Sequence, residues 1–378
     1  MRNTHLVEVK TEASVQEEIS YKPLAKEHLP GVADLLNRIF NSRFDAKVLE
    51  WKYFDNPAGK PISTVILAGA QVVGVLGSIP AKWVYKGTCV NAIKQVDLAI
   101  DQQYRRLDIY LQLVALNAID LARYKAFFTY GIANKESIEV NKSFLLNVAV
   151  NKVPRHSRIL NPLPYLKRMK IPSLLLPVLN TFGKLFLSMH YPSTARIPKG
   201  YTMETVTAFD KRFDSLWDRM KAEYDLALVR DADFLNWRYC RAPQMTYDIK
   251  IIQTRATGNI IGAIVLGLQE KPQRIGNIYD LLVPRDTPEK FTRALLCEAI
   301  QHFLRKKADK IRCWMYEHAH AYSTIKASGF FPRTDERCLN VSIDETRDDV
   351  PDISFFAKRE NWYISLSDSD TAFEFEED

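Results

Sequence analysis

The chain of 378 residues lacks most of the features that mark secreted, metal-binding or membrane-spanning proteins. Its five cysteines are scattered and show no CxxC spacing, which argues against a disulfide framework and a structural metal site. No run of 18 apolar residues exists to cross a bilayer, and the acidic N-terminus lacks the apolar core of a secretory signal. We therefore expect a cytoplasmic protein without a metal.

Acidic residues are also missing from one stretch, residues 151–200. This stretch holds nine Lys and Arg residues, whereas the rest of the chain holds 43 basic and 45 acidic residues. It carries seven of the 18 prolines, which exclude a single straight helix. Apolar residues from 178 to 189 nevertheless fit one broad helical face. Three interpretations stay open: a connector whose apolar face packs on two domains, an amphipathic element on an anionic membrane surface, or a site for a polyanionic substrate.

What the sequence does contain is a long-range repeat. Residues 45–57 (DAKVLEWKYFDNP) return 186 positions later as residues 231–243 (DADFLNWRYCRAP). Asp, Ala, Leu, Trp, Tyr and Pro recur in register, and chance rarely places Trp, Tyr and Pro at one fixed offset. The chain is therefore predicted to hold two copies of one domain. We expect the repeated aromatic residues to pack a helix against a sheet, with stacking on a sugar or base as the alternative.

The order of expected elements is the same in both halves. Apolar residues in short runs predict strands, and apolar residues three and four apart predict one-faced helices. The matching elements are strands at 73–75 and 261–263, strands at 96–100 and 279–283, helices at 109–123 and 289–306, and strands at 126–130 and 311–316. This pattern predicts an α+β fold. The expected parts are domain 1 (1–152), a basic, proline-rich apolar connector (153–200), and domain 2 (201–378) with an acidic C-terminal tail.

This order of elements resembles the GNAT superfamily of acyl-CoA-dependent N-acyltransferases, as two such domains in tandem over nearly the whole chain. Within it the chain looks most like acetyltransferase-like proteins associated with bacterial polysaccharide biosynthesis. The phrases that carry this likeness are 45–57, 131–137 (GIANKES), 361–363 (NWY) and 368–370 (DSD). The resemblance implies two GNAT-like domains, each a mixed, mostly antiparallel sheet flanked by helices. It also implies acetyl-CoA as the acyl donor.

In that superfamily, the loop before the central helix binds the cofactor pyrophosphate through backbone N–H groups. The family pattern is Arg or Gln, two residues, Gly, one residue, then Gly or Ala, because glycines let the main chain approach the phosphates. Arg105 matches the first position, whereas Asp108 and Tyr110 replace the glycines. Charge from Arg105 and Arg106 would then stand in for backbone contacts. The resemblance assigns the cofactor to Leu98, Ile100, Arg105, Arg106, Asp108, Ile109, Tyr110, Asn134 and Ser137.

The second half is expected to hold no nucleotide cofactor. Its corresponding loop, residues 284–288, has no glycine and two prolines, which remove two N–H donors. The same half also departs from the next family signature, which is Asn, two residues, Ala or Ser, three residues, and Tyr. His318 stands at its Asn position and Ile325 at its Tyr position.

In the first half, Asn134 and Ser137 match that second signature, but Asn141 stands where the family has a tyrosine. The family tyrosine protonates the leaving thiolate, a general-acid role. Without it, Tyr130 and Tyr110 are the candidates for the proton donor, and nothing in the sequence selects one.

A general base must take the proton of the acceptor amine before it attacks the thioester. Asp97 lies on the strand that would flank the acyl group, and Glu136 lies near the start of the following helix. Asp97 has a counterpart in the second half, Asp280, which also allows a structural role. The predicted catalytic residues are therefore Asp97, Glu136 and Tyr130.

The resemblance implies an N-acetyltransferase whose acceptor, a small-molecule amine or glycan precursor, lies in the cleft between the domains. The expected acceptor is an amino-sugar or related polysaccharide precursor. One alternative is a Fem-like aminoacyltransferase, which uses a charged tRNA and a cell-wall precursor and would suit the basic stretch 151–200. Another is a catalytically inactive assembly module, consistent with the missing glycines and tyrosine. DNA is not an expected partner, whereas an anionic membrane surface is a candidate partner of 151–200.

Overall fold

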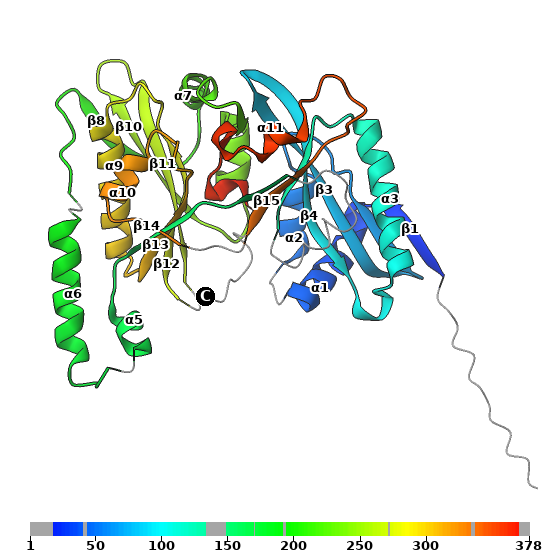
Figure 1. Ribbon diagram of the computed structural model, residues 1–378, viewed down its shortest axis with the longest axis horizontal. Helices are drawn as coiled ribbons and strands as arrows, with labels where there is room; N and C mark the ends of the chain where they lie inside the picture. The colour runs from blue at the N-terminus through cyan, green and yellow to red at the C-terminus, as the bar shows by residue number, and fades with distance from the viewer. Residues whose placement is uncertain are drawn as a thin grey trace, which may run out of the picture.

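The structure is a computed structural model that describes residues 18–40, 44–133, 149–169, 171–191, 194–270, 273–333 and 337–369. Figure 1 shows two β-sheets side by side, each with helices against it. Both sheets are mostly antiparallel, and each has a parallel pair near its centre: β4 (Thr88–Ile100) with β5 (Thr129–Ala133), and β12 (Ile275–Leu282) with β13 (Lys310–Trp314). The first sheet has a second parallel pair at its edge, β9 (Leu226–Leu228) with β16 (Trp362–Tyr363). The structure therefore confirms the predicted α+β class and the two mixed sheets flanked by helices.

The first sheet has the strand order β1-β2-β3-β4-β5-β15-β6, with β9 paired to the end of β3 and β16 paired to β9. The strands are β1 (Ile19–Pro23), β2 (Thr64–Ala68), β3 (Gln71–Tyr85), β4 (Thr88–Ile100), β5 (Thr129–Ala133), β15 (Cys338–Ser342), β6 (Ala149–Lys152), β9 (Leu226–Leu228) and β16 (Trp362–Tyr363). The helices of this half are α1 (Leu29–Phe40), α2 (Ala46–Tyr53) and α3 (Leu107–Tyr124).

The second sheet has the order β14-β7-β13-β12-β11-β10-β8. Its strands are β14 (Phe331–Pro332), β7 (Arg155–Ile159), β13 (Lys310–Trp314), β12 (Ile275–Leu282), β11 (Ile260–Gln269), β10 (Tyr247–Thr254) and β8 (Tyr201–Val206). The remaining α-helices are α5 (Leu163–Arg168), α6 (Leu176–His190), α7 (Lys211–Lys221), α8 (Ala232–Leu235), α9 (Glu289–Arg305), α10 (Tyr322–Ala327) and α11 (Ile353–Ala357). Helix α8 continues into a π-helix at Asn236–Cys240.

The two sheets have the same arrangement of strands, and in each sheet the strand next to one edge comes from the opposite half of the chain. In the first sheet, β15 lies between β5 and β6 and pairs with both. In the second sheet, β7 lies between β13 and β14 and pairs with both. A stretch that the sequence predicts as connector thus supplies a sheet strand. Because each half completes the sheet of the other, the two sheets depend on each other for their full width.

The repeated motif begins both α2 and α8 by the same device. The Asp45 carboxylate accepts a hydrogen bond from the Val48 N–H at 2.8 Å, and the Asp231 carboxylate accepts one from the Phe234 N–H, also at 2.8 Å. An N-cap aspartate satisfies a backbone donor that the first helical turn leaves without a partner. The conserved spacing within the two motifs therefore encodes two equivalent helix starts.

The two motifs meet at their tryptophans. The rings of Trp51 and Trp237 stack with centroids 4.9 Å apart and planes 20° apart. The Trp51 indole N–H donates to the Trp237 carbonyl at 2.8 Å, and the Trp237 indole N–H donates to the Trp51 carbonyl at 3.0 Å. The prediction that the repeated aromatic residues pack a helix against a sheet is therefore confirmed for Tyr53 and Tyr239, which are buried in the two cores, and wrong for the tryptophans. The pair is a nearly symmetric contact between the halves.

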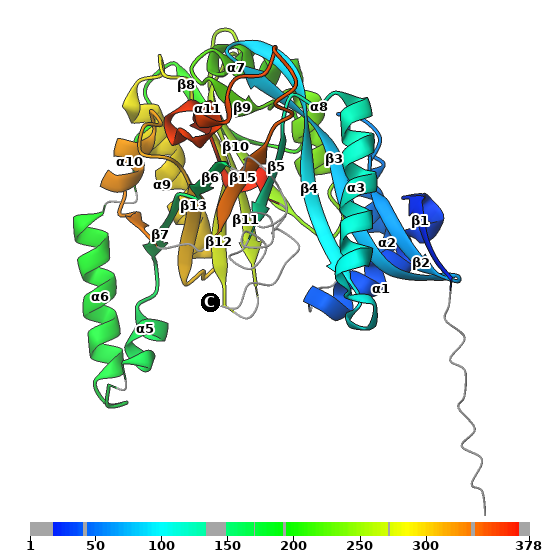
Figure 2. The ribbon, with the colours of Figure 1, turned by 45° about the vertical axis from the view of Figure 1, so that its right-hand side comes forward.

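The stretch between the halves also differs from the expected packed connector. Five apolar side chains of α6 are between 52% and 70% exposed, namely Val178, Phe182, Leu185, Phe186 and Met189. Figure 2 shows α5 and α6 beside the second sheet, away from the first. The apolar face of α6 is therefore not packed on two domains. Within the described residues, no helix combines the length and apolar character needed to cross a membrane.

Candidate functional site

A pocket of about 890 Å³, including its open mouth, lies between the two halves. The tryptophan pair forms part of its wall. The first half contributes Lys52, Asn56, Pro80, Lys82, Lys94 and Tyr130, and the second half contributes Leu228, Asp231, Asp233, Arg238, Ser367 and Asp368. A cleft lined from two packed units is a common position for a small-molecule site. We refer to it as the inter-half pocket.

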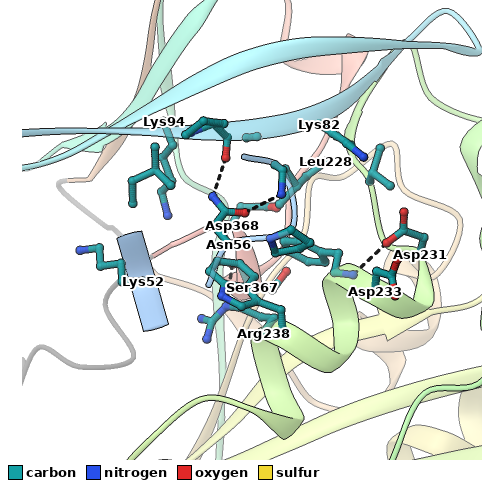
Figure 3. Close-up of a pocket in the computed structure, with 18 of the residues that line it drawn as sticks. Lys52, Asn56, Lys82, Lys94, Leu228, Asp231, Asp233, Arg238, Ser367 and Asp368 are labelled. Carbon is teal, nitrogen blue, oxygen red and sulfur yellow. Dashed lines mark hydrogen bonds between the residues drawn. The ribbon is translucent and has the colours of Figure 1, made fainter. Parts of the chain in front are cut away.

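Charges of both signs surround this pocket, as Figure 3 shows. Lys82 and Lys94 come from strands β3 and β4 of the first half. Asp231 and Asp233 come from the start of α8 in the second half. The pocket therefore offers ammonium groups from one half and carboxylates from the other, so it can contact a ligand that itself carries both signs of charge.

Asp97 lies behind this pocket at an irregular point of β4. Its carboxylate accepts hydrogen bonds from the Lys52 ammonium at 2.8 Å and from the Tyr53 hydroxyl at 2.5 Å. The side chains of Lys52 and Asp97 are each 5% exposed. Asp97 has a φ of 52°, where the pairing of β3 with β4 shifts register. Such a bulge re-aims a side chain, and a left-handed aspartate is a local strain often found at functional sites.

The equivalent position in the second half, Asp280, is enclosed by a larger network. The Tyr239 hydroxyl donates to it at 2.5 Å, as Tyr53 does to Asp97. Here, however, Arg230 is the cation, and it bridges Asp280 and Asp368, each at 2.9 Å. All three charged side chains are fully buried. Burial opposes the charge on Arg230, but the two carboxylates raise its pKa, whereas burial raises the pKa of Asp368.

Tyr130 lies where two central strands of the first sheet separate. Strands β4 and β5 are paired in parallel at Ile93 with Thr129 and at Lys94 with Tyr130. Beyond these pairs, β4 continues along β3 and β5 continues along β15. The Tyr130 side chain is buried and lies edge-on to Trp83, with ring centroids 5.0 Å apart. Both Lys94 and Tyr130 line the inter-half pocket, so the pocket reaches this separation.

A second cavity, a groove of about 1030 Å³, lies on the opposite face of the first sheet. Helix α3 forms one wall, and Ser78 of β3 joins the sheet to α3 through a hydrogen bond to Asn117 at 3.2 Å. The groove is mainly apolar, and its lining includes Leu98, Tyr110, Val114, Leu121 and Phe128. Gln95 and Thr129, neighbours in sequence of Lys94 and Tyr130, line the groove rather than the pocket. The two cavities therefore approach each other at the separation of β4 and β5.

The first turn of α3 lies beside the groove. Its N-cap residue, Arg106, supplies no side-chain hydrogen bond to that turn. Arg106 instead pairs with Asp108 at 2.6 Å on the surface, while Arg105 donates to the Ile100 carbonyl at 3.2 Å. The Asp108 carboxylate is thus balanced by Arg106, which lowers its pKa. An 18-residue helix with backbone donors at its start and two nearby arginines is suited to bind an anion.

The structure places the other predicted cofactor residues in two settings. Leu98 and Tyr110 line the groove, and burial raises the pKa of Tyr110. Ile100 and Ile109 are instead buried in an apolar cluster with neighbouring strands. Three further predictions, Asn134, Glu136 and Ser137, lie outside the described residues.

Several pocket residues are not among the site residues predicted from the sequence. Lys52 stands inside the repeated motif, where its replacement by Arg238 in the second copy was a usable signal. Lys82 and Lys94 carried no such signal, because exposed lysines on strands are common. Asp231 and Asp233 were visible as part of the motif, but their position opposite lysines of the other half depends on the packing of the halves. Among the described residues, no group of His, Cys, Asp and Glu is arranged to hold a metal ion.

Comparison with known proteins finds no matching family model and no matching curated protein. Solved structures do match. Saccharomyces cerevisiae N-myristoyltransferase with bound myristoyl-CoA and inhibitors is 13% identical with a TM-score of 0.59, and the match covers 85% of this chain and 79% of that one. A GCN5-related N-acetyltransferase from Anabaena variabilis is 12% identical with a TM-score of 0.59, covering 86% and 73%.

A conserved protein from Enterococcus faecalis, named as a probable N-acyltransferase of unknown function, is 12% identical with a TM-score of 0.61. That match covers 86% of this chain and 73% of the other. At these identities the likeness is one of fold. The two mixed sheets, each flanked by helices, are therefore a GNAT-like fold of the kind found in these N-acyltransferases.

Proposed function

We propose that this protein is an acyl-CoA-dependent N-acyltransferase whose first half binds the donor and whose inter-half pocket binds the acceptor. The observation that carries this proposal is the placement of the two cavities. The groove beside α3 and the inter-half pocket lie on opposite faces of the first sheet and approach each other where β4 and β5 separate. A thioester entering from one face and an amine entering from the other would meet there.

The donor side is supported by charge and shape. The start of α3, with Arg105 and Arg106, offers an anion site for the pyrophosphate, and the apolar groove offers room for the pantetheine and acyl group. In the second half, the corresponding loop is tied down, since the Arg219 guanidinium pairs with Asp286 at 2.7 Å. We therefore assign the donor, proposed as acetyl-CoA, to the first half.

The acceptor side is supported by the two signs of charge in the inter-half pocket. Asp231 and Asp233 would attract a positively charged acceptor into the pocket, while Lys82 and Lys94, the latter beside the separation of β4 and β5, would contact acidic groups close to the reacting amine. An amino sugar carried on a phosphate-containing precursor has both kinds of group. The proposed acceptor is therefore an amino-sugar or related polysaccharide precursor.

Acyl transfer to an amine requires two proton transfers and no metal. The amine nitrogen loses a proton, forms the C–N bond with the thioester carbonyl carbon, and expels the thiolate as the C–S bond breaks; the thiolate then takes up a proton. We assign proton uptake to Asp97, which contacts the pocket-lining Lys52. Tyr130 on the pocket side and Tyr110 on the groove side are the candidates for the group that gives a proton to the thiolate. A tyrosine phenol is protonated at neutral pH, and burial raises the pKa of Tyr110 further.

Calorimetric titration with acetyl-CoA tests the donor assignment. The double variant Arg105→Gln/Arg106→Gln should bind at least about tenfold more weakly, because hydrogen bonds to charged groups contribute about 1.5–3 kcal/mol each. The matched control is Arg285→Gln in the corresponding loop of the second half, which should leave binding unchanged. Absence of heat at millimolar acetyl-CoA would exclude the proposal. Salt-sensitive tRNA binding instead would favour an aminoacyltransferase.

A further inference from the structure

The segment from Leu160 to Tyr191 forms an arm that carries α5 and α6 on the outer side of the second sheet (Figures 1 and 2). Its apolar residues follow one another at helical spacing of three and four along α6. The exposed members are Val178, Leu179, Phe182, Leu185, Phe186 and Met189, and Leu175 just before the helix is exposed as well. Few soluble proteins leave such a continuous apolar surface exposed unless something binds to it.

The arm is attached to the second sheet at both ends. At its start, the Asn161 amide donates to the Asp309 carboxylate at 2.7 Å. At its end, the Arg158 guanidinium donates to the Tyr191 carbonyl at 2.9 Å and also to the Ser328 carbonyl. Between these points, Gly183 of α6 lies against Pro162, where a Cβ would leave too little space. Contacts at both ends of the arm, one of them buried and two partly buried, therefore hold the apolar face outward.

The charges carried by the arm and its flanking residues, 151–200, are all of one sign. Residues 151–200 contain nine Lys and Arg and no Asp or Glu. On the arm itself, Lys167 and Arg168 end α5 and Lys184 lies within α6, and all three side chains are exposed. A second copy docked through this face would bring lysines against lysines, which is unfavourable. An anionic surface is instead complementary to it in charge.

The length of α6 also limits what it can do. Its 15 residues extend about 22 Å, whereas the apolar core of a bilayer is about 30 Å thick. Helices with a broad apolar face and flanking lysines lie in the plane of the interface, with the apolar side chains among the lipid tails. We propose that the arm docks this protein on a membrane surface rich in anionic phospholipid. This surface is separate from the proposed catalytic site, so either proposal can fail without the other.

Sedimentation of the full chain with vesicles tests the proposal. At low salt, the protein should sediment with vesicles of equal phosphatidylcholine and phosphatidylglycerol and remain largely free with phosphatidylcholine alone. Raising the salt to 0.5 M should release most of it, because the attraction is screened. The variant Lys167→Gln/Arg168→Gln/Lys184→Gln should bind up to about 100-fold more weakly, since each basic residue near an anionic surface contributes roughly fivefold.

A second variant, Phe182→Ser/Phe186→Ser, should also lose binding to anionic vesicles, because the apolar face inserts. Two matched controls should bind like the wild type: Phe40→Ser/Ile119→Ser, which removes exposed apolar side chains of the first half, and Lys22→Gln/Lys60→Gln/Lys211→Gln, which removes exposed charges away from the arm. Circular dichroism confirms that each variant is folded. No sedimentation at low salt would overturn the proposal, and so would wild-type binding by the Phe182/Phe186 variant. Concentration-dependent dimers lost in that same variant would identify a second copy as the occupant and overturn it too.

Discussion

Helices α3 and α9 occupy the same place in the two halves but pack very differently. Helix α3 buries three side chains, Ile109, Leu113 and Asn117, and leaves the groove beside it. Helix α9 buries ten side chains against the second sheet. The loops before the two helices also differ. The loop before α9 is joined to α7 by the ion pair between Asp286 and Arg219, whereas α3 begins beside two arginines on the surface. Of the two halves, the first is thus the more open and the second the more closed.

The central aspartates show the same contrast. Asp97 has one lysine partner, which lines the inter-half pocket, whereas Asp280 is enclosed with Arg230 and Asp368 away from solvent. The position of Arg230 corresponds to Phe44 in the first half, whose ring lies 5.6 Å from the Lys52 ammonium. In the second half, the hydroxyls of Ser365 and Ser367 also donate to Asp280. We infer that the first half is the binding half and the second a support.

The strongest test of this contrast exchanges the two aspartates for asparagine. Asp97→Asn should lower kcat by about 100- to 10,000-fold, the usual contribution of a general base. Asp280→Asn should lower stability while leaving kcat close to that of the wild type. Acyl transfer is followed with acetyl-CoA and an amine acceptor, and unfolding is followed in urea. Equal losses of kcat in both variants would mean that both aspartates act through the fold.

Loss of the buried network around Arg230 should strongly lower the free energy of unfolding. Arg230→Met leaves Asp280 and Asp368 without their cation, and breaking a buried ion pair in this way costs about 3–5 kcal/mol. Urea unfolding measures the loss. Arg219→Met is the control, because its pair with Asp286 is partly exposed and should contribute less than about 1 kcal/mol. A similar loss in both variants would contradict the closed character of the second half.

The tryptophan pair tests how firmly the halves are joined. Trp51→Ala and Trp237→Ala should each destabilise the protein by about 3–5 kcal/mol, because a large buried ring is lost. The double variant should show a coupling of about 1 kcal/mol, since stacked rings interact beyond their burial. Unfolding curves of the four proteins give the coupling. Strict additivity would show that the stacking itself adds no stability.

Larger side chains on α3 and α9 should show how differently the two helices are packed. Ala118→Trp places a ring at the groove beside α3 and should change stability by less than about 0.5 kcal/mol while blocking acetyl-CoA binding. Ala299→Phe in α9 should destabilise by about 1–3 kcal/mol, because that site is already filled. Thermal unfolding and calorimetric titration measure the two effects. Unchanged cofactor binding by Ala118→Trp would exclude the groove as the donor site.

The smallest expected effect is a pH dependence of the free energy of unfolding that arises from two buried histidines of the second sheet and its helix. Burial lowers the pKa of His156 on β7 and of His302 on α9 below the ordinary value. The unfolded chain therefore binds more protons, so stability is complete above the unfolded pKa and is lost as the pH falls from about 7 towards the folded values. The loss is at most about 1.4 kcal/mol per pH unit for each histidine. His156→Gln should reduce the slope, measured by urea unfolding from pH 7.5 to 5.5.

Much of the local structure could be predicted because local signals carry it. The repeated Asp at the motif start predicts a helix start, and the helix expected at 289–306 is found as α9 (Glu289–Arg305). The strand expected at 126–130 instead runs Thr129–Ala133, because its bounds are set by pairing with β15 from the far end of the chain. The candidate site follows the same division. Asp97 and Tyr130 could be proposed from their strands, whereas Lys82, Lys94 and Asp233 face one pocket only because the halves pack together.

The sequence by itself determined the repeated motif, the α+β class, the helix starts and the basic, apolar character of residues 151–200. Each of these depends on spacing or composition within a short stretch. Only the tertiary structure decided the exchange of β7 and β15, the stacking of Trp51 on Trp237, and which half stays open. These features depend on contacts between residues more than a hundred positions apart. Many pairings of similar apolar strands are compatible with one pattern, and only packing selects among them.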